Sequence, residues 1–64
     1  MSNKKLRVFR YLSGKSQDEL AVLTGLSQSK ISRIERGYIQ PKSEDKKIIA
    51  KILDVPTEQL FPEQ

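Results

Sequence analysis

Glycine and proline residues divide this chain into short segments, and their positions constrain its fold more than any other feature. Within the segments, apolar residues recur three or four positions apart, which is typical of amphipathic helices. The three glycines and three prolines all fall between these segments, where a helix would begin or end. The pattern predicts an all-α protein in which five short helices form a single domain over residues 1–64.

The first two predicted helices meet at Gly14. The first helix runs from about residue 3 to residue 12 and ends at Ser13-Gly14, because glycine readily adopts the left-handed conformation that a helix end often requires. Ser16 and Glu19 then form a capping-box pattern, in which each side chain accepts a backbone N–H of the other residue. The buried side of the first helix is expected to carry Leu6, Val8, Phe9 and Leu12. The capping box precedes the apolar residues Leu20, Ala21 and Leu23 of the second helix.

The third predicted helix follows a tight turn at Thr24-Gly25-Leu26. Ser27 is its expected N-cap, and Gly37 is its expected end. Its apolar stripe consists of Leu26, Ile31 and Ile34, and its outward side consists of Gln28, Ser29, Ser32, Arg33 and Arg36.

A fourth helix is expected to start at Lys42 or Ser43, with two acidic residues near its positive end. Residues 54–56 interrupt the pattern, and Thr57 is expected to cap a last short turn. Four apolar residues are expected to form the buried side of the fourth helix: Ile48, Ile49, Ile52 and Leu53. The last turn carries Leu60 and Phe61.

Charge is distributed unevenly along the chain. All 12 Lys and Arg and five of the eight acids lie in residues 1–53, and the remainder holds three acids and no base. A basic body suits a nucleic acid, an anionic membrane or an acidic partner, and charge alone does not distinguish them. The chain has no Cys, no His and no glycine-rich phosphate loop, and it is too short to enclose a substrate pocket comfortably. We therefore expect no enzymatic activity, no metal site and no cofactor.

The segment QDELAVLTGLSQSKISRIER, residues 17–36, carries the functional signal. Two short helices joined by a four-residue turn around Gly25 must cross closely, and the small side chain of Ala21 permits this crossing. The spacing is that of a helix-turn-helix, whose second helix enters the major groove of DNA. A single polar-faced helix is narrow enough for that groove, which is about 12 Å wide.

The chain resembles the lambda and 434 repressor and Cro family, also called the Xre-type helix-turn-helix family. The resemblance rests on SQDELAVLTGLSQSKISRIERG followed by Pro41, on LRVFR in the first helix, and on IIAKILDVPTEQLF near the end. It therefore spans nearly the whole chain. The resemblance implies a compact five-helix domain that binds operator DNA, commonly as a two-fold dimer.

By this resemblance, Gln28 is the first residue of the recognition helix, and Gln17 approaches a phosphate while bracing Gln28. The amide of Gln28 can accept and donate at once, which matches N7 and N6 of adenine in a bidentate pair. Arg33, one turn further on, would make the corresponding pair with guanine or else grip a phosphate, and we favour the base contact. Ser29 and Ser32 would set finer base preferences.

Phosphate contacts are expected from helix starts and nearby cations, because exposed helix N-termini bind anions. Three such regions are expected near DNA: the starts of the second and third helices and the loop before the fourth. For Tyr38, packing beneath that loop is an equal alternative. The expected phosphate-binding residues are Gln17, Ser27, Lys30, Arg36, Tyr38, Gln40 and Lys42.

The resemblance also implies a structural ion pair between Arg10 and Glu35, which would link the first helix to the end of the recognition helix. Two residues depart from the family pattern. Lys46 stands where an apolar residue is usual, so we expect either that this end of the fourth helix is more exposed or shifted, or that Lys46 buries its aliphatic stem and keeps its ammonium group in water. Asp54 stands where glycine is usual, and it can adopt left-handed geometry at some cost.

These observations predict a sequence-specific DNA-binding transcriptional regulator, a repressor that occupies an operator in double-stranded DNA. We expect a homodimer on DNA, with Val55, Leu60 and Phe61 either closing the core or forming the dimer contact. The chain has no apolar run that would indicate a signal peptide or membrane span, so we expect no membrane partner, no small-molecule ligand, and a cytoplasmic, nucleoid-associated location in a bacterial or phage-infected cell. The alternative is an antitoxin or co-regulator module whose main partner is another protein.

Overall fold

The computed structural model describes residues 3–62, and this part of the chain forms five α-helices and no strand. The molecule measures 25 × 22 × 20 Å along its principal axes. None of the helices in the described part is both long enough and apolar enough to span a membrane. The helices are α1 (Lys4–Leu12), α2 (Gln17–Thr24), α3 (Gln28–Arg36), α4 (Ser43–Leu53) and α5 (Thr57–Leu60).

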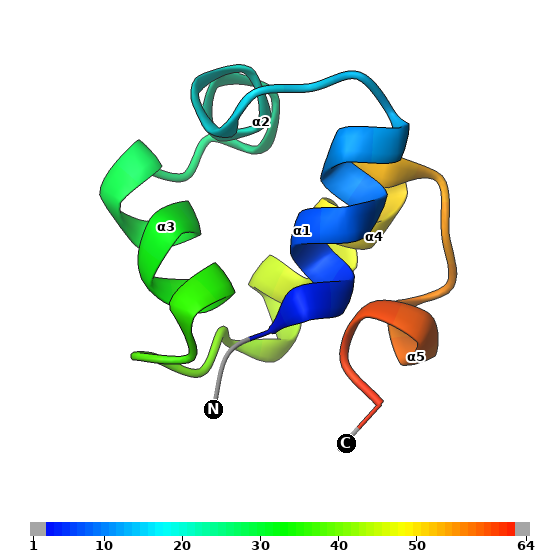
Figure 1. Cartoon of the computed structure of the whole chain (residues 1–64). Helices are drawn as coiled ribbons and strands as arrows, with labels where there is room; N and C mark the ends of the chain where they lie inside the picture. The colour runs from blue at the N-terminus through cyan, green and yellow to red at the C-terminus, as the bar shows by residue number, and fades with distance from the viewer. Residues whose placement is uncertain (1–2, 63–64) are drawn as a thin grey trace.

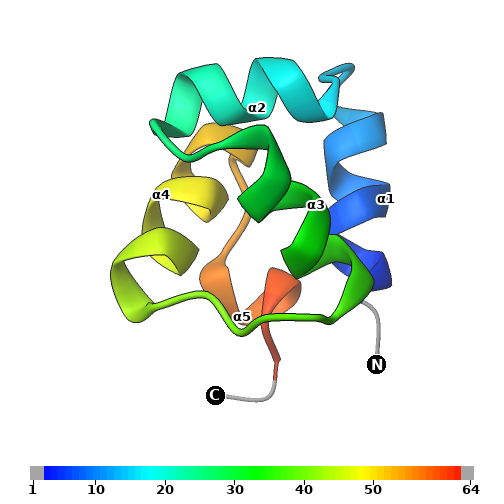
Figure 2. The same cartoon turned by 90° about the vertical axis from the view of Figure 1, so that its left-hand side faces the viewer.

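Helix α2 lies across one end of the bundle, next to both α3 and α4. It packs against both of these helices, whereas α1 packs against α3 and α5. Figure 1 shows α3 at the outer edge of the bundle, with α1 between it and α5. In Figure 2, which is turned by 90° about the vertical axis, α2 runs above α3, and α3 faces the viewer. The arrangement therefore leaves one long side of α3 without a helix over it.

The helix starts of α2 and α3 are capped as the sequence predicts. Ser16 Oγ accepts the N–H of Glu19 at 3.0 Å, and Glu19 Oε1 accepts the N–H of Ser16 at 2.8 Å, which completes a capping box. Ser27 Oγ accepts the N–H of Lys30 at 3.1 Å. Each of these bonds satisfies a backbone donor that the helix itself leaves without an acceptor.

Three helices end on a residue in the left-handed conformation. Gly25 and Gly37 end α2 and α3 with φ values of 78° and 79°. Asp54 ends α4 with φ 60°, and it is the one non-glycine residue with positive φ among residues 3–62. The expectation that Asp54 takes the place of a glycine there is confirmed.

All five helices contribute apolar side chains to one core. Phe9, Leu26, Ile52 and Val55 pack against its edge. The buried apolar residues are Leu6, Leu20, Ala21, Ile31, Ile34, Ile49, Ala50, Leu53, Leu60 and Phe61. Leu60 and Phe61 therefore close the core, which decides between the two uses that the sequence left open for them.

Three residues expected on the buried side are exposed instead: Val8, Leu12 and Ile48. Each lies more than a quarter turn from the buried stripe of its helix, because successive residues are rotated by about 100° in an α-helix. In α2 the inward position belongs to Thr24, whose Oγ1 donates to the carbonyl of Leu20 at 2.8 Å. The hydroxyl of Thr24 can be buried at this position because it is hydrogen-bonded within its own helix.

Two expectations for the C-terminal half are wrong. Lys46 does not lie at an exposed or shifted end of α4, because it is only 7% exposed. Its Nζ lies 5.8 Å from the centre of the Phe61 ring, within the range of a cation–π contact. Thr57 is not an N-cap: Pro56 holds that position with an extended ψ of 143°, and no side chain caps α5. The fixed φ of proline suits the start of a helix, so α5 begins one residue earlier than expected.

Asn3 joins three helices at the end of the bundle opposite α2. Its Oδ1 accepts the N–H of Leu6 at 3.0 Å and so caps α1. Its backbone N–H donates to the carbonyl of Glu35 at 2.9 Å, and its Nδ2 donates to the carbonyl of Leu60 at 3.1 Å. One short side chain and its backbone thus connect the start of α1 to the ends of α3 and α5.

Candidate nucleic-acid interface

The turn between α2 and α3 is short and internally hydrogen-bonded. Gly25 reverses the chain in the left-handed conformation, and Thr24 Oγ1 accepts the N–H of Leu26 at 3.3 Å. Ala21 and Ile31 lie in the same buried cluster on either side of the turn. The small side chain of Ala21 lets α2 and α3 approach closely, and the two helices form the predicted helix-turn-helix.

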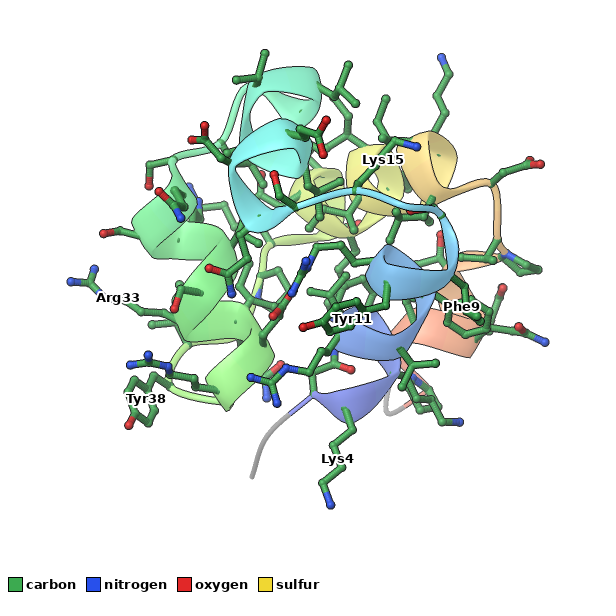
Figure 3. All side chains as sticks on the ribbon, turned by 45° about the horizontal axis from the view of Figure 1, so that its top comes forward. Lys4, Phe9, Tyr11, Lys15, Arg33 and Tyr38 are labelled. Atoms are coloured by element: carbon green, nitrogen blue, oxygen red, sulfur yellow. The ribbon has the colours of Figure 1, made fainter. Side chains whose placement is uncertain are left out.

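The four side chains expected to read bases lie along the open side of α3. Gln28, Ser29 and Arg33 are exposed and Ser32 is half-buried, whereas Ile31 and its apolar neighbours face the core. Figure 3 shows Arg33 projecting away from the body of the protein. The structure thus brings these polar groups together on one face, where hydrogen-bonding groups are available to a partner.

The residues around the loop after α3 are also exposed. Tyr38 is 70% exposed, and the guanidinium carbon of Arg36 lies 6.0 Å from the centre of its ring. Packing of Tyr38 beneath the loop is therefore wrong. In Figure 3, Tyr38 lies on the same side of the molecule as Arg33. Gln40 and Lys42 are exposed as well, and Lys42 is the N-cap of α4, a helix that has no side-chain cap hydrogen bond.

A buried ion pair supports the far side of α3. Arg10 Nε lies 2.6 Å from Glu35 Oε2, and Arg10 Nη2 donates to Glu35 Oε1 at 3.2 Å. Both side chains are buried. Arg10 Nη1 also donates to the carbonyl of Lys15 at 2.9 Å, just before α2 begins. A single guanidinium therefore fixes the end of α3 relative to α1 and the start of α2.

Gln17 belongs to the same network. Its Nε2 donates to Glu35 Oε1 at 3.0 Å, and within residues 3–62 no hydrogen bond joins it to Gln28, the residue that it was expected to brace. A carboxylate is the stronger acceptor because it carries a full charge. The side chain that opens α2 is thus oriented by the buried ion pair.

An open hollow lies beside the start of α2. Its lining includes Lys15, Gln17 and Gln28, together with the capping-box residues Ser16 and Glu19. The first N–H groups of a helix have no intrahelical acceptor, so they can bind an anion in such a hollow. The acidic Asp18 also lines the hollow, and the capping box already engages the N–H groups of Ser16 and Glu19.

The sequence matches the profile of the helix-turn-helix family over residues 4–60. This chain belongs to the Cro/C1-type helix-turn-helix family. A search of curated proteins returned no significant match. Membership of this family makes the protein a DNA-binding transcriptional regulator.

Two solved structures are similar to the structure of this Cro/C1-type protein. The restriction-modification controller protein C.AhdI from Aeromonas hydrophila has a TM-score of 0.87 and 34% identity, with 92% of this chain and 89% of that chain covered. The hypothetical transcription factor NHTF from Neisseria has a TM-score of 0.81 and 34% identity, with 86% of this chain covered. This chain spans 62% of the length of the Neisseria protein.

One expected phosphate ligand of this Cro/C1-type domain is engaged within the protein. Lys30 Nζ lies 2.9 Å from Asp45 Oδ2, so the ammonium group of α3 is paired with a carboxylate in the first turn of α4. The sequence showed Asp45 only as a favourable charge at a helix start. Pairing between residues fifteen positions apart depends on how α3 and α4 are placed, and no local pattern signals it.

Proposed function

We propose that this protein is a sequence-specific transcriptional repressor that places α3 in the major groove of an operator. The observation that carries the proposal is the open polar face of α3, which bears Gln28, Ser29 and Arg33. A helix of nine residues is about 13 Å long, and its width matches a groove about 12 Å wide. The capped turn and the buried ion pair behind α3 would hold this face rigid against DNA.

Direct reading of bases would fall to the first and middle turns of α3. Gln28 begins the helix, and its amide can donate to N7 and accept from the N6 amino group of one adenine. Arg33 projects from the same face and can donate two hydrogen bonds to guanine O6 and N7. Ser29 and Ser32 carry short hydroxyls that adjust to either a donor or an acceptor, so they would refine the preference.

Phosphates on either side of the groove would be bound by helix starts and exposed cations. Gln17 and Ser27 stand at the starts of α2 and α3, where free N–H groups and the helix dipole favour an anion. Lys42 stands at the uncapped start of α4. Arg36, Tyr38 and Gln40 are exposed beside it and would extend this second contact.

Binding by two copies follows from the size of one. The longest dimension of the molecule is 25 Å, whereas successive major grooves on one side of the duplex are about 34 Å apart. One copy therefore reaches one groove only. We expect two copies related by a two-fold axis, so the operator would be an inverted repeat whose half-sites are about one helical turn apart.

Repression would arise when the operator overlaps a promoter, because the bound protein and RNA polymerase would compete for the same duplex. The likeness to a restriction-modification controller favours one class of target, the genes of such a system. In vitro transcription from a promoter that carries the selected site measures the sign of regulation directly. A repressor lowers the transcript level in proportion to operator occupancy.

The decisive test is selection of binding sites from random duplex DNA with the parent protein and with Gln28→Ala. The parent is expected to select an inverted repeat with adenine at one position in each half-site. Gln28→Ala should lose that adenine preference, at about 1 to 3 kcal/mol per contact. Gln59→Ala, an exposed glutamine on α5, is the matched control and should select the parental site. A parent that selects no site, or a Gln28→Ala variant with the parental preference, rules out the proposed reading of DNA.

A further inference from the structure

Lys30 and Asp45 form a link between the recognition helix and α4. Lys30 lies in the first turn of α3 and Asp45 in the first turn of α4, and Nζ and Oδ2 are 2.9 Å apart. The main packing of α3 is against α2 and α1, so this ion pair spans two helices with little other contact. The ion pair keeps the ammonium group of Lys30 against α4 and away from the open polar face of α3.

The environment of Asp45 makes this pair harder to open than an ordinary surface pair. The side chain of Asp45 is 14% exposed and that of Lys30 is 35% exposed. Asp45 Oδ2 is buried, and within residues 3–62 no donor is aligned with it as a hydrogen bond; the approach of Lys30 is close but not in that geometry. The positive charge of Lys30 therefore compensates a buried negative charge, and removal of the lysine would leave that charge uncompensated.

We propose that Asp45 is a specificity-determining residue that withholds Lys30 from the phosphate backbone and so weakens sequence-independent binding to DNA. Each phosphate that a protein neutralises adds to affinity for any duplex, whatever its sequence. A lysine held by a buried carboxylate adds nothing to that affinity. The inference rests on the proposed function, and it replaces the expectation from the sequence that Lys30 binds a phosphate.

The first turn of α4 contains a second acid that allows a matched control. Glu44 precedes Asp45 and is exposed. Glu44→Gln and Asp45→Asn each remove one negative charge from the same turn, so any general repulsion of DNA falls by a similar amount in both. Only Asp45→Asn also releases Lys30. The difference between the two variants thus isolates the effect of the ion pair.

The experiment measures binding to a fluorescent 20-base-pair duplex of random sequence by anisotropy, from 50 to 200 mM NaCl. We expect Asp45→Asn to raise affinity on the order of tenfold at 50 mM and to steepen the slope of log K against log salt by about 0.9, because one more phosphate is neutralised. Glu44→Gln should leave that slope unchanged. Lys30→Gln should keep the parental slope, and the double variant Lys30→Gln/Asp45→Asn should keep it too and gain over Lys30→Gln only what Glu44→Gln gains over the parent.

Three results would overturn the inference. These are equal slopes for Asp45→Asn and Glu44→Gln, a gain from Asp45→Asn that persists in full in the Lys30→Gln background, and a parental slope that falls by about 0.9 in Lys30→Gln. The last result would mean that Lys30 already binds phosphate. If the parent binds no duplex at any salt, the proposed function fails as well. If the parent binds and one of the three results appears, only the inference fails.

A second measurement needs no variant and covers the case in which Asp45→Asn does not fold. In the parent protein, nuclear magnetic resonance follows the side-chain ammonium groups of Lys30 and Lys42 while the random duplex is added. The inference predicts that the Lys42 signal shifts with saturation and that the Lys30 signal does not. Equal shifts at both lysines would place Lys30 on the phosphates and contradict the inference.

Discussion

Glu35 accepts the guanidinium of Arg10 through both of its carboxylate oxygens, at 2.6 and 3.2 Å, inside the protein. Removal of either partner would leave a buried charge, so we expect Glu35→Ala to reduce the free energy of unfolding by about 3 to 5 kcal/mol. A domain of this size has little stability to lose. Urea unfolding followed by circular dichroism measures the loss.

The control for this prediction replaces both charges at once. Arg10→Met with Glu35→Leu exchanges the ion pair for apolar side chains and should be clearly more stable than Glu35→Ala alone. If Glu35→Ala unfolds at the parental urea concentration, the pair contributes no stability and the prediction is wrong.

The close approach of α2 and α3 depends on the size of Ala21. Ala21 is 6% exposed, so Ala21→Leu would force extra volume into a packed core, at a cost of about 1 to 3 kcal/mol. In a domain of this size, each kcal/mol lowers the melting temperature by about 4 to 8 °C. Val22→Leu is the neighbouring control, because Val22 is 77% exposed and should tolerate the change. Equal melting temperatures for the two variants would show that the crossing does not require a small residue.

Asp54 holds a left-handed conformation that favours glycine. Left-handed geometry costs a residue with a side chain about 1 to 2 kcal/mol. Replacement by glycine would remove that cost, but glycine also makes the unfolded chain more flexible, which offsets part of the gain. We expect Asp54→Gly to raise the unfolding free energy by up to about 1 kcal/mol and Asp54→Ala to lower it. Thermal unfolding of the three proteins at one pH gives the order. A glycine variant less stable than the parent would mean that the aspartate contributes more than its strain costs.

Arg33 and Lys42 are expected to affect DNA binding in different ways. Lys42→Gln should weaken binding to every duplex alike and reduce the salt slope by about 0.9. Arg33→Ala should instead relax the preference at one base position, by about 1 to 3 kcal/mol for a bidentate contact with guanine. Binding to the selected site and to single-base variants of it separates the two patterns. An Arg33→Ala variant that weakens all sites equally would make Arg33 a phosphate ligand.

The helix boundaries could be predicted because their signals are local. Ser16 and Glu19 lie three positions apart, and their reciprocal bonds form wherever a helix starts between them. Gly25 and Gly37 end their helices by their own conformational freedom. The polar face of α3 could also be predicted from the sequence, because the period of a helix determines which residues share a side.

Contacts between distant residues could not be derived in this way. A buried stem for Lys46 was among the sequence-based alternatives, but nothing local indicates that its ammonium group would lie over Phe61. The bond from Gln17 to Glu35 and the pair of Lys30 with Asp45 likewise depend on how helices are placed in space. The ion pair of Arg10 with Glu35 was expected only through the family resemblance, and the structure contains it.

Asn3 connects the first turn of α1 to the last residues of α3 and α5, as described above. Helix ends in small proteins usually fray independently, on a faster scale than global unfolding. Here the two ends of the described chain share one residue, so the loss of α5 would remove one of the three hydrogen bonds that hold Asn3 at the start of α1 and at the end of α3. Hydrogen exchange at the Leu6 amide should therefore report the same opening event as exchange at the Phe61 amide, and the end of α3 would be at its most mobile when that event occurs.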